Sequence, residues 1–444
     1  MQSFEGRRTV VAGAGVSGAA VARALHARGA HVTVVDADGT LDGFDVVDLD
    51  SPPDGTELVV TSPGWRPDAP LLVAARARGI EVYGEVELAW RLRGENAAPW
   101  LAVTGTNGKT TTVKMLASIL TAAGHRTVAA GNVGLPLLDA VLADPPYDVL
   151  AVELSSFQLH WSSSVQPVAA AILNLAPDHL DWHGSLGAYA TAKSLIWAGT
   201  TSIGNADDEV SRTLLSRAKG RRVAFTLRTP RPGELGVVED LLVDRAFPDV
   251  PGEATELACL ADLTVTGGHN VANALAAAAL ARAYGVPADA VRTGLRTFTA
   301  DPHRNELVAT VDGVTWVDDS KATNPHAAAA SLASYDRIVW IAGGLLKGAA
   351  VDDLVRDAAP HLAAAVLLGE DRELLREALV RHAPDVPVVE VTRLDTEAMS
   401  EVVAAARRLA QPGDTVLLAP AAASMDCFSD YKQRGDLFAA LARG

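Results

Sequence analysis

Short apolar runs alternate with alanine-rich stretches of helical length along most of the chain. Runs such as TVVAGAG from Thr9, PWLAVTG from Pro99 and IVWIAGG from Ile338 have the length of buried strands, and each is followed by an alanine-rich stretch. This alternation predicts parallel sheets with crossover helices, the α/β class. Asp312-Gly313 interrupts the run ELVATVDGVTWVDD and predicts a hairpin at that point.

The pattern divides into three blocks, and 444 residues are enough for about three domains of ordinary size. We predict a Rossmann-like N-terminal domain at 1–98 and a central P-loop ATPase-type domain with a parallel sheet at 99–301. A C-terminal Rossmann-like α/β domain follows at 302–444. Within the central block, residues 221–252 are rich in proline, glycine and charge, and we expect loops there.

Composition excludes several classes of protein. The formal net charge is −16 and no basic cluster stands out, which argues against a nucleic-acid partner. No apolar run is long enough to cross a bilayer, and residues 1–8 lack the apolar stretch of a signal peptide. The two cysteines, Cys259 and Cys427, form no metal-binding spacing. We therefore expect a cytoplasmic monomer that binds no membrane.

A glycine-rich loop after the second block's first strand has the chemistry of a phosphate site. Gly105-Thr106-Asn107-Gly108-Lys109-Thr110 lies between this strand and the helical segment TTTVKMLASILTAAG. Backbone N–H groups there would surround a polyphosphate, Lys109 would reach the β- and γ-phosphates, and the Thr110 hydroxyl would bind Mg²⁺. Val103 stands where the usual motif has a further glycine. The alternative is a glycine-rich turn with a solvated lysine.

Acidic and imidazole side chains downstream could complete a metal site. Glu153 ends an apolar strand, where a carboxylate can hold Mg²⁺ opposite a phosphate loop, although an acid facing water has the same pattern. The segment PDHLDWHG gathers Asp178, His179, Asp181 and His183. It favours Mg²⁺ with one histidine over zinc, which would need a further protein ligand, or else it is a loop of solvated acids. Lys193 has the spacing of a surface lysine.

A second glycine-rich loop lies at the start of the chain. Gly13 to Gly18 read GAGVSG after a strand, and Asp36 ends the next strand. This pattern is typical of a Rossmann nucleotide site. A second nucleotide loop follows in the next block, so a substrate that carries a nucleotide fits better than NAD. A turn without a ligand is the alternative.

Taken together, these motifs resemble those of the Mur ligase family, which joins amino acids to UDP-muramoyl precursors. The matching segments span nearly the whole chain: GTNGKTT, GNVGLP from Gly131, ELSSFQL from Glu153, DHLDWHG, GGHNVANALAA, PHR, and DDSKATNPHA from Asp318. The segment DSKATN, together with GAGVSG, resembles the members that add D-glutamate.

The resemblance implies an ATP-dependent, amide-forming ligase of peptidoglycan precursor synthesis, and with it a part in cell-wall growth, cell shape and cell division. The expected substrates are ATP, D-glutamate and UDP-N-acetylmuramoyl-L-alanine, with Mg²⁺ as cofactor and an acyl phosphate as intermediate. The three blocks would bind the UDP group, ATP and the amino acid, in that order.

The resemblance also assigns roles to single residues. Those implied for ATP are Gly105, Thr106, Asn107, Gly108, Lys109, Thr110, Thr111, Asn270, Asn273, Arg304 and Asp319. Those implied for the UDP substrate are Gly15, Val16, Ser17, Asp36, Ser62, Gly64, Asn132 and Ser155. Those implied for D-glutamate are Lys321, Thr323, Lys347, Ser424 and Tyr431. Those implied for metal are Thr110, Glu153, His179 and Lys193, the last as a carbamate, and those implied for catalysis are Lys109, His179, Lys193 and Lys321.

Two positions depart from the family pattern, and three other functions stay open. Leu345 follows the paired glycines where many relatives have an acid, and Ala37 follows Asp36 where a hydroxyl or basic residue would hold the uridine phosphates. A related ligase such as a folylpolyglutamate synthetase would share the ATP core. An NAD-dependent oxidoreductase would use Gly13 to Gly18, and a nucleotide-binding regulator would catalyse nothing.

Overall fold

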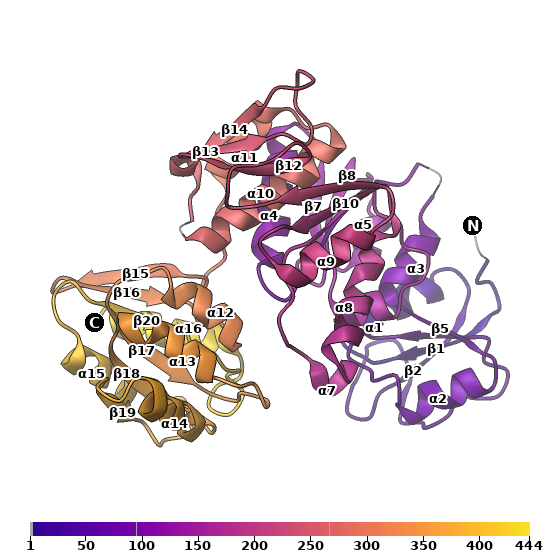
Figure 1. The fold of residues 1–444 in the computed structure, drawn as a ribbon. Helices are drawn as coiled ribbons and strands as arrows, with labels where there is room; N and C mark the ends of the chain where they lie inside the picture. Colours follow the sequence, from indigo (N-terminus) through magenta and orange to yellow (C-terminus); the bar gives the residue numbers. More distant parts are fainter. Residues whose placement is uncertain (1–2, 95, 266) are drawn as a thin grey trace. The chain divides into compact units, whose positions relative to one another are not determined.

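A computed structural model describes residues 3–94, 96–265 and 267–444. The chain forms two compact units (Figure 1). Unit 1 comprises Met1–Thr264 with Asn270–Phe298, and unit 2 comprises Val265–His269 with Thr299–Gly444. Each of the three sheets takes its strands from one predicted domain range, and the first two sheets share unit 1. The predicted domain limits at 98 and 301 stay predictions.

The N-terminal sheet of unit 1 is parallel, with strand order β3-β2-β1-β4-β5. Its elements are β1 (Arg8–Ala12), α1 (Val16–His26), β2 (His31–Val35), β3 (Val46–Val47), β4 (Leu58–Thr61), α2 (Pro70–Ala77), β5 (Glu81–Gly84) and α3 (Glu85–Leu92). The chain goes from β1 to β2 on one side and returns to β4 on the other. The crevice between the carboxyl ends of β1 and β4 is therefore the place where such sheets bind ligands.

The central sheet of unit 1 has the order β14-β13-β12-β11-β10-β9-β6-β8-β7. Its strands are β6 (Trp100–Thr104), β7 (Thr127–Gly131), β8 (Val149–Glu153), β9 (Ala169–Ile172), β10 (Thr201–Asn205), β11 (Arg221–Phe225), β12 (Glu234–Val238), β13 (Leu241–Asp244) and β14 (Thr255–Cys259). Strands β6 to β12 are parallel, and β13 and β14 add an antiparallel edge. The expectation of loops over 221–252 is thus wrong in part, because β11, β12 and β13 lie there.

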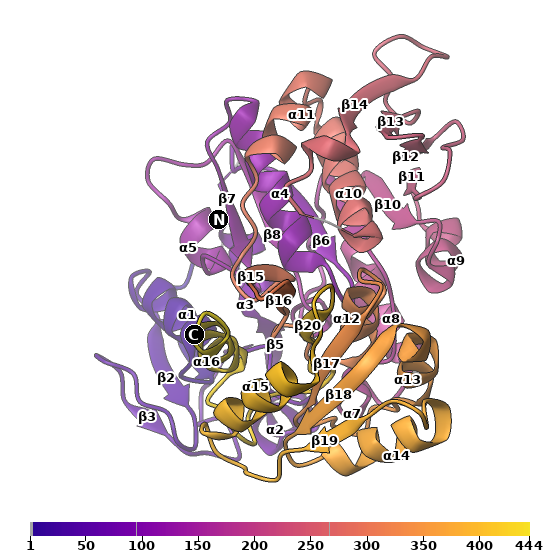
Figure 2. The same cartoon turned by 90° about the vertical axis from the view of Figure 1, so that its left-hand side faces the viewer.

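Helices cover the central sheet, and one of them is buried along most of its length. They are α4 (Lys109–Ala122), α5 (Leu137–Val141), α6 (Ser156–His160), α7 (Leu180–His183), α8 (Leu186–Ser194), α9 (Glu209–Arg217), α10 (Gly268–Tyr284) and α11 (Ala288–Thr297). Helix α10 is buried from Asn273 to Arg282, and Figure 2 shows it with α4 and α11, of which α11 packs against α4. Gly285, in a left-handed conformation, ends it as the sequence predicts.

Two buried carboxylates of α3 tie the N-terminal sheet to the central sheet. Glu85 accepts the Leu138 N–H of α5 at 3.0 Å. Glu87, which is 0% exposed, accepts the N–H groups of Ser163 at 2.8 Å and Ser164 at 3.0 Å. Burial raises the pKa of Glu85 to about 7. These joints help to make the two sheets one compact unit.

Unit 2 contains a six-stranded sheet with the order β15-β16-β20-β17-β18-β19. Its elements are β15 (Glu306–Val311), β16 (Val314–Asp318), α12 (Pro325–Leu332), β17 (Ile338–Gly343), α13 (Asp352–Ala358), β18 (Leu362–Leu368), α14 (Arg372–His382), β19 (Val388–Glu390), α15 (Ala398–Leu409), β20 (Thr415–Leu418) and α16 (Tyr431–Ala442). Strands β15 and β16 form the predicted hairpin, with left-handed Asp312 and Gly313 at its turn. The other strands are parallel.

The helices of unit 2 cover both faces of its sheet. Buried residues of α15 and α16 belong to one hydrophobic core, and buried residues of α12, α13 and α14 belong to another. Strand β20, the last in the chain, lies between β16 and β17. This reversal of strand order opens a crevice at the carboxyl ends of β16, β20 and β17. None of the helices within the described ranges has the length and apolar character needed to cross a membrane.

Candidate nucleotide and substrate sites

The predicted phosphate loop joins β6 to α4, and its backbone requires glycine. Gly108 has a left-handed φ of 82° immediately before the helix. A Cβ at this position would lie 2.3 Å from Asn273 Oδ1, so no side chain fits. Thr110 and Thr111 lie in the first turn of α4, where unpaired N–H groups attract an anion. Strand, loop and helix thus follow the predicted order.

The end of β9 clamps this loop from the side. Asn107 N–H donates to Asn174 Oδ1 at 2.8 Å, and Asn174 Nδ2 donates to Asn107 O at 3.1 Å. Thr106 Oγ1 lies 3.1 Å from the Tyr189 hydroxyl and accepts the Ala176 N–H at 3.0 Å. The loop is therefore held in shape by neighbouring segments of unit 1.

Two lysines converge on one carbonyl oxygen of the loop. Lys109 Nζ donates to Gly105 O at 2.9 Å and to Thr106 O at 2.7 Å. Lys193 Nζ donates to Gly105 O at 2.8 Å and lies 4.7 Å from the ring centre of Tyr189. Lys193 is only 2% exposed, so the expectation of a surface lysine from spacing alone is wrong. Burial, and then the charge of Lys109, hold the pKa of Lys193 well below 10.5.

Glu153 ends β8 beside the loop and keeps one oxygen free for a ligand. Its Oε1 accepts Asn132 Nδ2 at 2.8 Å, whereas its Oε2 is buried and has no hydrogen-bond partner among the described residues. The side chain does not face water, since Glu153 is 1% exposed. Glu153 pairs with Val103 of β6, and Thr110 lies in the first turn of α4. A free carboxylate oxygen and a hydroxyl are donors that suit Mg²⁺. The residues present therefore fit the predicted metal.

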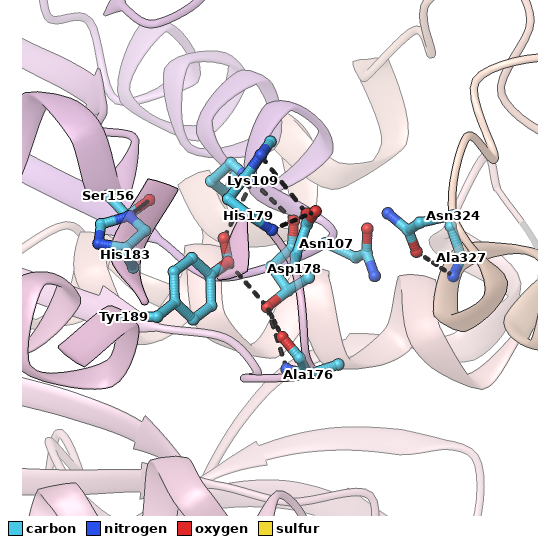
Figure 3. A network of polar contacts seen from close by, with 12 residues as sticks. Asn107, Lys109, Ser156, Ala176, Asp178, His179, His183, Tyr189, Asn324 and Ala327 are labelled. Carbon is cyan, nitrogen blue, oxygen red and sulfur yellow. Dashed lines mark hydrogen bonds and ion pairs between the residues drawn. The ribbon is translucent and has the colours of Figure 1, made fainter. Parts of the chain in front are cut away.

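His179 lies beside the two lysines with a left-handed φ of 52°, just before α7. Figure 3 shows His179, Lys109 and Asp178 close together. Burial lowers the pKa of His179, the Asp178 carboxylate raises it, and the charges of Lys109 and Lys193 lower it further. The imidazole is thus held in the neutral form that can bind a metal. His183 is turned elsewhere, with Nε2 2.9 Å from Ser156 Oγ.

The N-terminal glycine loop is shaped by the carboxylate of Asp36. Asp36 accepts the Ala14 N–H at 2.8 Å and the Gly39 N–H at 3.0 Å. The bond from Ala14 is the main reason why the pKa of Asp36 is lowered. Gly15 precedes α1, and Val16 in its first turn is 75% exposed.

The other predicted residues of the UDP site come from several strand ends. Ser17 is half-buried in the first turn of α1, and Gly64 is exposed after β4. The Oγ of Ser62 is buried without a hydrogen-bond partner among the described residues. Asn132 is engaged with Glu153. Ser155 caps α6 through a capping box, which already explains its hydroxyl.

The predicted adenine contacts lie one helical turn apart on α10. Asn273 Nδ2 donates to Asn270 Oδ1 at 3.2 Å, and Thr112 Oγ1 of α4 donates to Asn273 Oδ1 at 3.2 Å. Both asparagines are buried, at 7% and 6% exposure. They therefore join the phosphate loop's helix to α10.

In unit 2, the two predicted ATP contacts lie at the start and end of the first hairpin. Asp319 follows β16 and accepts hydrogen bonds from the Asn305 N–H at 3.2 Å and from the Ser331 hydroxyl. Burial raises the pKa of Asp319 to about 6. Arg304 precedes β15, with its Nε 3.8 Å from an Asp301 carboxylate oxygen.

The predicted D-glutamate residues come from the loops after β16, β17 and β20, at the crevice of the unit 2 sheet. Lys321 Nζ lies 3.8 Å from the ring centre of Tyr431, and the Thr323 N–H donates to Lys321 O at 2.8 Å. Lys347 has a left-handed φ of 52°, and Ser424 is 3% exposed. The loops at this end of the sheet and the start of α16 thus carry two lysines, two hydroxyl residues and an aromatic ring.

Sequence reasoning missed the buried arginine that supports this crevice. Arg434 is 0% exposed, and its guanidinium donates to Ser320 Oγ at 2.9 Å, to Ser320 O at 2.8 Å and to Ala422 O at 3.2 Å. Burial lowers the pKa of Arg434 to about 10. Its partners are mostly backbone oxygens distant in sequence, so no local pattern in the sequence indicates them.

A second missed group is the pair of His303 and Asp318, whose Nδ1 and Oδ2 are 2.7 Å apart. Together with Glu306 their ligand atoms lie within 4.8 Å of one another. Glu306 already accepts the His303 N–H at 2.9 Å, and Asp318 accepts the Ser320 N–H at 2.8 Å. The cluster is thus satisfied as a hydrogen-bonded pair and needs no metal.

Comparison with known proteins identifies the family. Residues 103–281 match the Mur ligase middle domain, and residues 303–422 match the Mur ligase, glutamate ligase domain. The UDP-N-acetylmuramoylalanine–D-glutamate ligase of Thermobifida fusca is 62% identical, with 99% of each chain covered. The enzyme of the same name from Streptomyces avermitilis is 58% identical, with 100% of this chain and 99% of the relative covered.

Solved structures show the same fold at lower identity. MurF from Acinetobacter baumannii has a TM-score of 0.63 at 21% identity, covering 99% of this chain and 92% of its own. A pseudomurein peptide ligase type C from Methanothermus fervidus also has a TM-score of 0.63, at 19% identity, covering 98% and 100%. The chain therefore belongs to the Mur ligase family of ATP-dependent, amide-forming ligases.

Proposed function

We propose that this ligase adds D-glutamate to UDP-N-acetylmuramoyl-L-alanine, through an acyl phosphate, in peptidoglycan precursor synthesis. The observation that carries the proposal is the group around Gly105, where Lys109 and Lys193 meet beside the free Oε2 of Glu153. The UDP-N-acetylmuramoylalanine–D-glutamate ligase of Thermobifida fusca is 62% identical over 99% of this chain. These matches argue against an oxidoreductase.

The chemistry follows from the weakness of a carboxylate as an electrophile. The γ-phosphoryl group of ATP passes to the alanyl carboxylate, and ADP leaves. The amine of D-glutamate then attacks the acyl carbon, and phosphate departs as the amide bond forms. Lys109 and the N–H groups at the start of α4 neutralise the crowded phosphate oxygens. Asn270 and Asn273 of α10 would contact adenine.

Glu153, Thr110 and His179 would hold Mg²⁺, with Lys193 joining them as a carbamate. When bound, Mg²⁺ would neutralise negative charge on the phosphoryl group during its transfer. Lys193 Nζ donates to Gly105 O, and in its protonated form it has no lone pair to offer a cation. Its depressed pKa favours the neutral amine, which is the form that reacts with CO₂ to give a carbamate.

The substrate that carries UDP would bind at the crevice between β1 and β4, near the predicted residues in the segments after β1, β2 and β4. D-Glutamate would bind in unit 2, where Lys321 and Lys347 act as point charges on its carboxylates. We further propose that the enzyme works as a cytoplasmic monomer, binds no nucleic acid or membrane, and serves cell-wall growth and cell division.

A phosphate-release assay tests the function directly. Purified protein is given ATP, Mg²⁺ and UDP-N-acetylmuramoyl-L-alanine, together with D-glutamate, L-glutamate, glycine or diaminopimelate. We expect phosphate release when the added amino acid is D-glutamate and none with the other three amino acids. Equal rates with every amino acid, or no release with any of them, would refute the proposal.

A matched pair of lysine variants tests the amino-acid site. Lys321→Ala should raise the KM for D-glutamate far more than the KM for ATP, because only the amino acid loses a charge partner. Lys432→Ala removes an exposed lysine of the same unit and serves as the control. Equal loss of both substrates in Lys321→Ala would contradict the assignment.

A further inference from the structure

The loop that carries Lys347 is joined to the loop that carries Ser424 by a pair of backbone hydrogen bonds. Leu345 N–H donates to Ala423 O at 2.8 Å, and Ala423 N–H donates to Leu345 O at 3.0 Å. Lys347 is two residues beyond this bridge on one side, and Ser424 is one residue beyond it on the other. The bridge therefore sets the spacing of the two backbones.

Asp371, in the loop after β18, holds the Lys347 loop from its other side. Its Oδ2 accepts the Leu346 N–H at 2.7 Å, and its own N–H donates to Gly344 O at 3.2 Å. Leu346 is 4% exposed, so its N–H has little water to turn to. The loop contains no carboxylate of its own, because Leu345 follows the paired glycines. Its shape therefore depends on an acid from another loop.

The same set of hydrogen bonds also joins the loop after β18 to the loop after β20. Asp426, two residues after Ser424, accepts the Glu370 N–H on its Oδ2 at 2.8 Å. The loops after β17, β18 and β20 are thus tied to one another in a closed set. A shift in one of them would be passed to the others.

Lys347 needs this support because of its backbone. A φ of 52° is a conformation that residues with a Cβ adopt at a cost. Such a conformation persists when the surrounding structure fixes it. The hydrogen bond from the Leu346 N–H to the Asp371 carboxyl group fixes the residue immediately before Lys347.

We propose that Asp371 is a positioning residue for the amino-acid substrate. Its carboxylate shapes the turn that aims Lys347 toward a substrate carboxylate, at a spacing from Ser424 set by the Leu345–Ala423 bridge. Asp371 itself touches no substrate. The inference rests on the proposed function, because it takes Lys347 and Ser424 to bind the amino acid.

The test compares Asp371→Ala and Asp371→Asn with a control at the amino ends of the strands of the same sheet, away from the loops that carry Lys347 and Ser424. Asp414 also shapes a turn, accepting the Gln411 N–H on Oδ2 at 2.9 Å just before β20. The KM values for D-glutamate and ATP, and the melting temperature, are measured for each variant. Asp371→Ala should raise the KM for D-glutamate about tenfold or more, and Asp371→Asn, which keeps an acceptor oxygen, about threefold. The KM for ATP should stay within about twofold.

Asp414→Asn should lower the melting temperature and leave the KM for D-glutamate unchanged. An unchanged KM for D-glutamate in folded Asp371→Asn and Asp371→Ala would overturn the inference. An equal rise in the KM for ATP would overturn it as well, since that is the mark of a structural role. Failure of the proposed function is distinguishable, because wild-type protein would then release no phosphate with D-glutamate.

Discussion

The joint between the two sheets of unit 1 predicts a stability that depends on pH. Glu87 accepts hydrogen bonds from Ser163, Ser164 and Arg91, the last at 2.8 Å. Burial alone would raise the pKa of this carboxyl group, but the bonds from Ser164, Ser163 and Arg91 outweigh it and lower the pKa to about 2. Glu87→Gln removes the charge and keeps the size of the side chain.

The magnitude follows from the pKa. A fall from 4.5 to about 2 stabilises the ionised form by about 3 kcal/mol. Arg91 is 25% exposed and partly screened by salt, so we expect the variant to lose about 2 kcal/mol at neutral pH. Because the folded pKa is depressed, this stability is complete above about pH 5 and is lost as the pH falls toward 2. Less than about half of it should remain near pH 3.

The assay is thermal or urea unfolding of wild type and Glu87→Gln at pH 7, 4.5 and 3, with the difference between the two proteins as the result. Glu81→Gln is the control, since Glu81 pairs with the same Arg91 at 2.7 Å but is 47% exposed. Its effect should be below about 0.5 kcal/mol. A wild-type advantage that does not shrink between pH 7 and pH 3 would refute the reasoning.

Three further predictions concern the candidate sites. Glu153→Gln removes an anionic ligand and should raise the Mg²⁺ concentration for half-maximal activity about tenfold or more, measured by Mg²⁺ titration; an unchanged value would argue against a metal there. Gly108→Ala should lose ATP binding by calorimetry, whereas Gly124→Ala, also left-handed but with no atom within 4 Å of its Cβ, should bind normally. Arg434→Met should cost about 3 kcal/mol in urea unfolding, because Ser320 loses its donors; a stability loss below about 1 kcal/mol would count against this role.

The parts of the fold that were predictable from sequence are those with local signals. The order of strand, glycine turn and helix around Gly105 and Gly13 is encoded within short segments, and the structure shows β6 before α4 and β1 before α1. Asp312-Gly313 likewise specifies its own turn. Strands β12 and β13 were missed because proline, glycine and charge around them mask short strands at the sheet edge.

The parts of the site that escaped prediction depend on contacts between distant segments. Lys193 has the spacing of a surface lysine, and only the packing of α8 against the β6 loop buries it. Glu87 and Ser163 are 76 residues apart, and Arg434 and Ser320 are 114 residues apart. Buried charges of this kind are satisfied by backbone groups and hydroxyls, which carry no signature in a single sequence.

The side chain of Asn273 occupies the space that any Cβ at position 108 would need. The residue predicted to contact adenine thus also packs against the turn that would bind the phosphates. Replacing Asn273 by a larger residue, in order to change which purine is bound, would bring that side chain into contact with the backbone at Gly108 and disturb the turn. Selection for variants that use GTP should therefore recover compensated replacements on α4 and α10 together, and seldom a single exchange at 273.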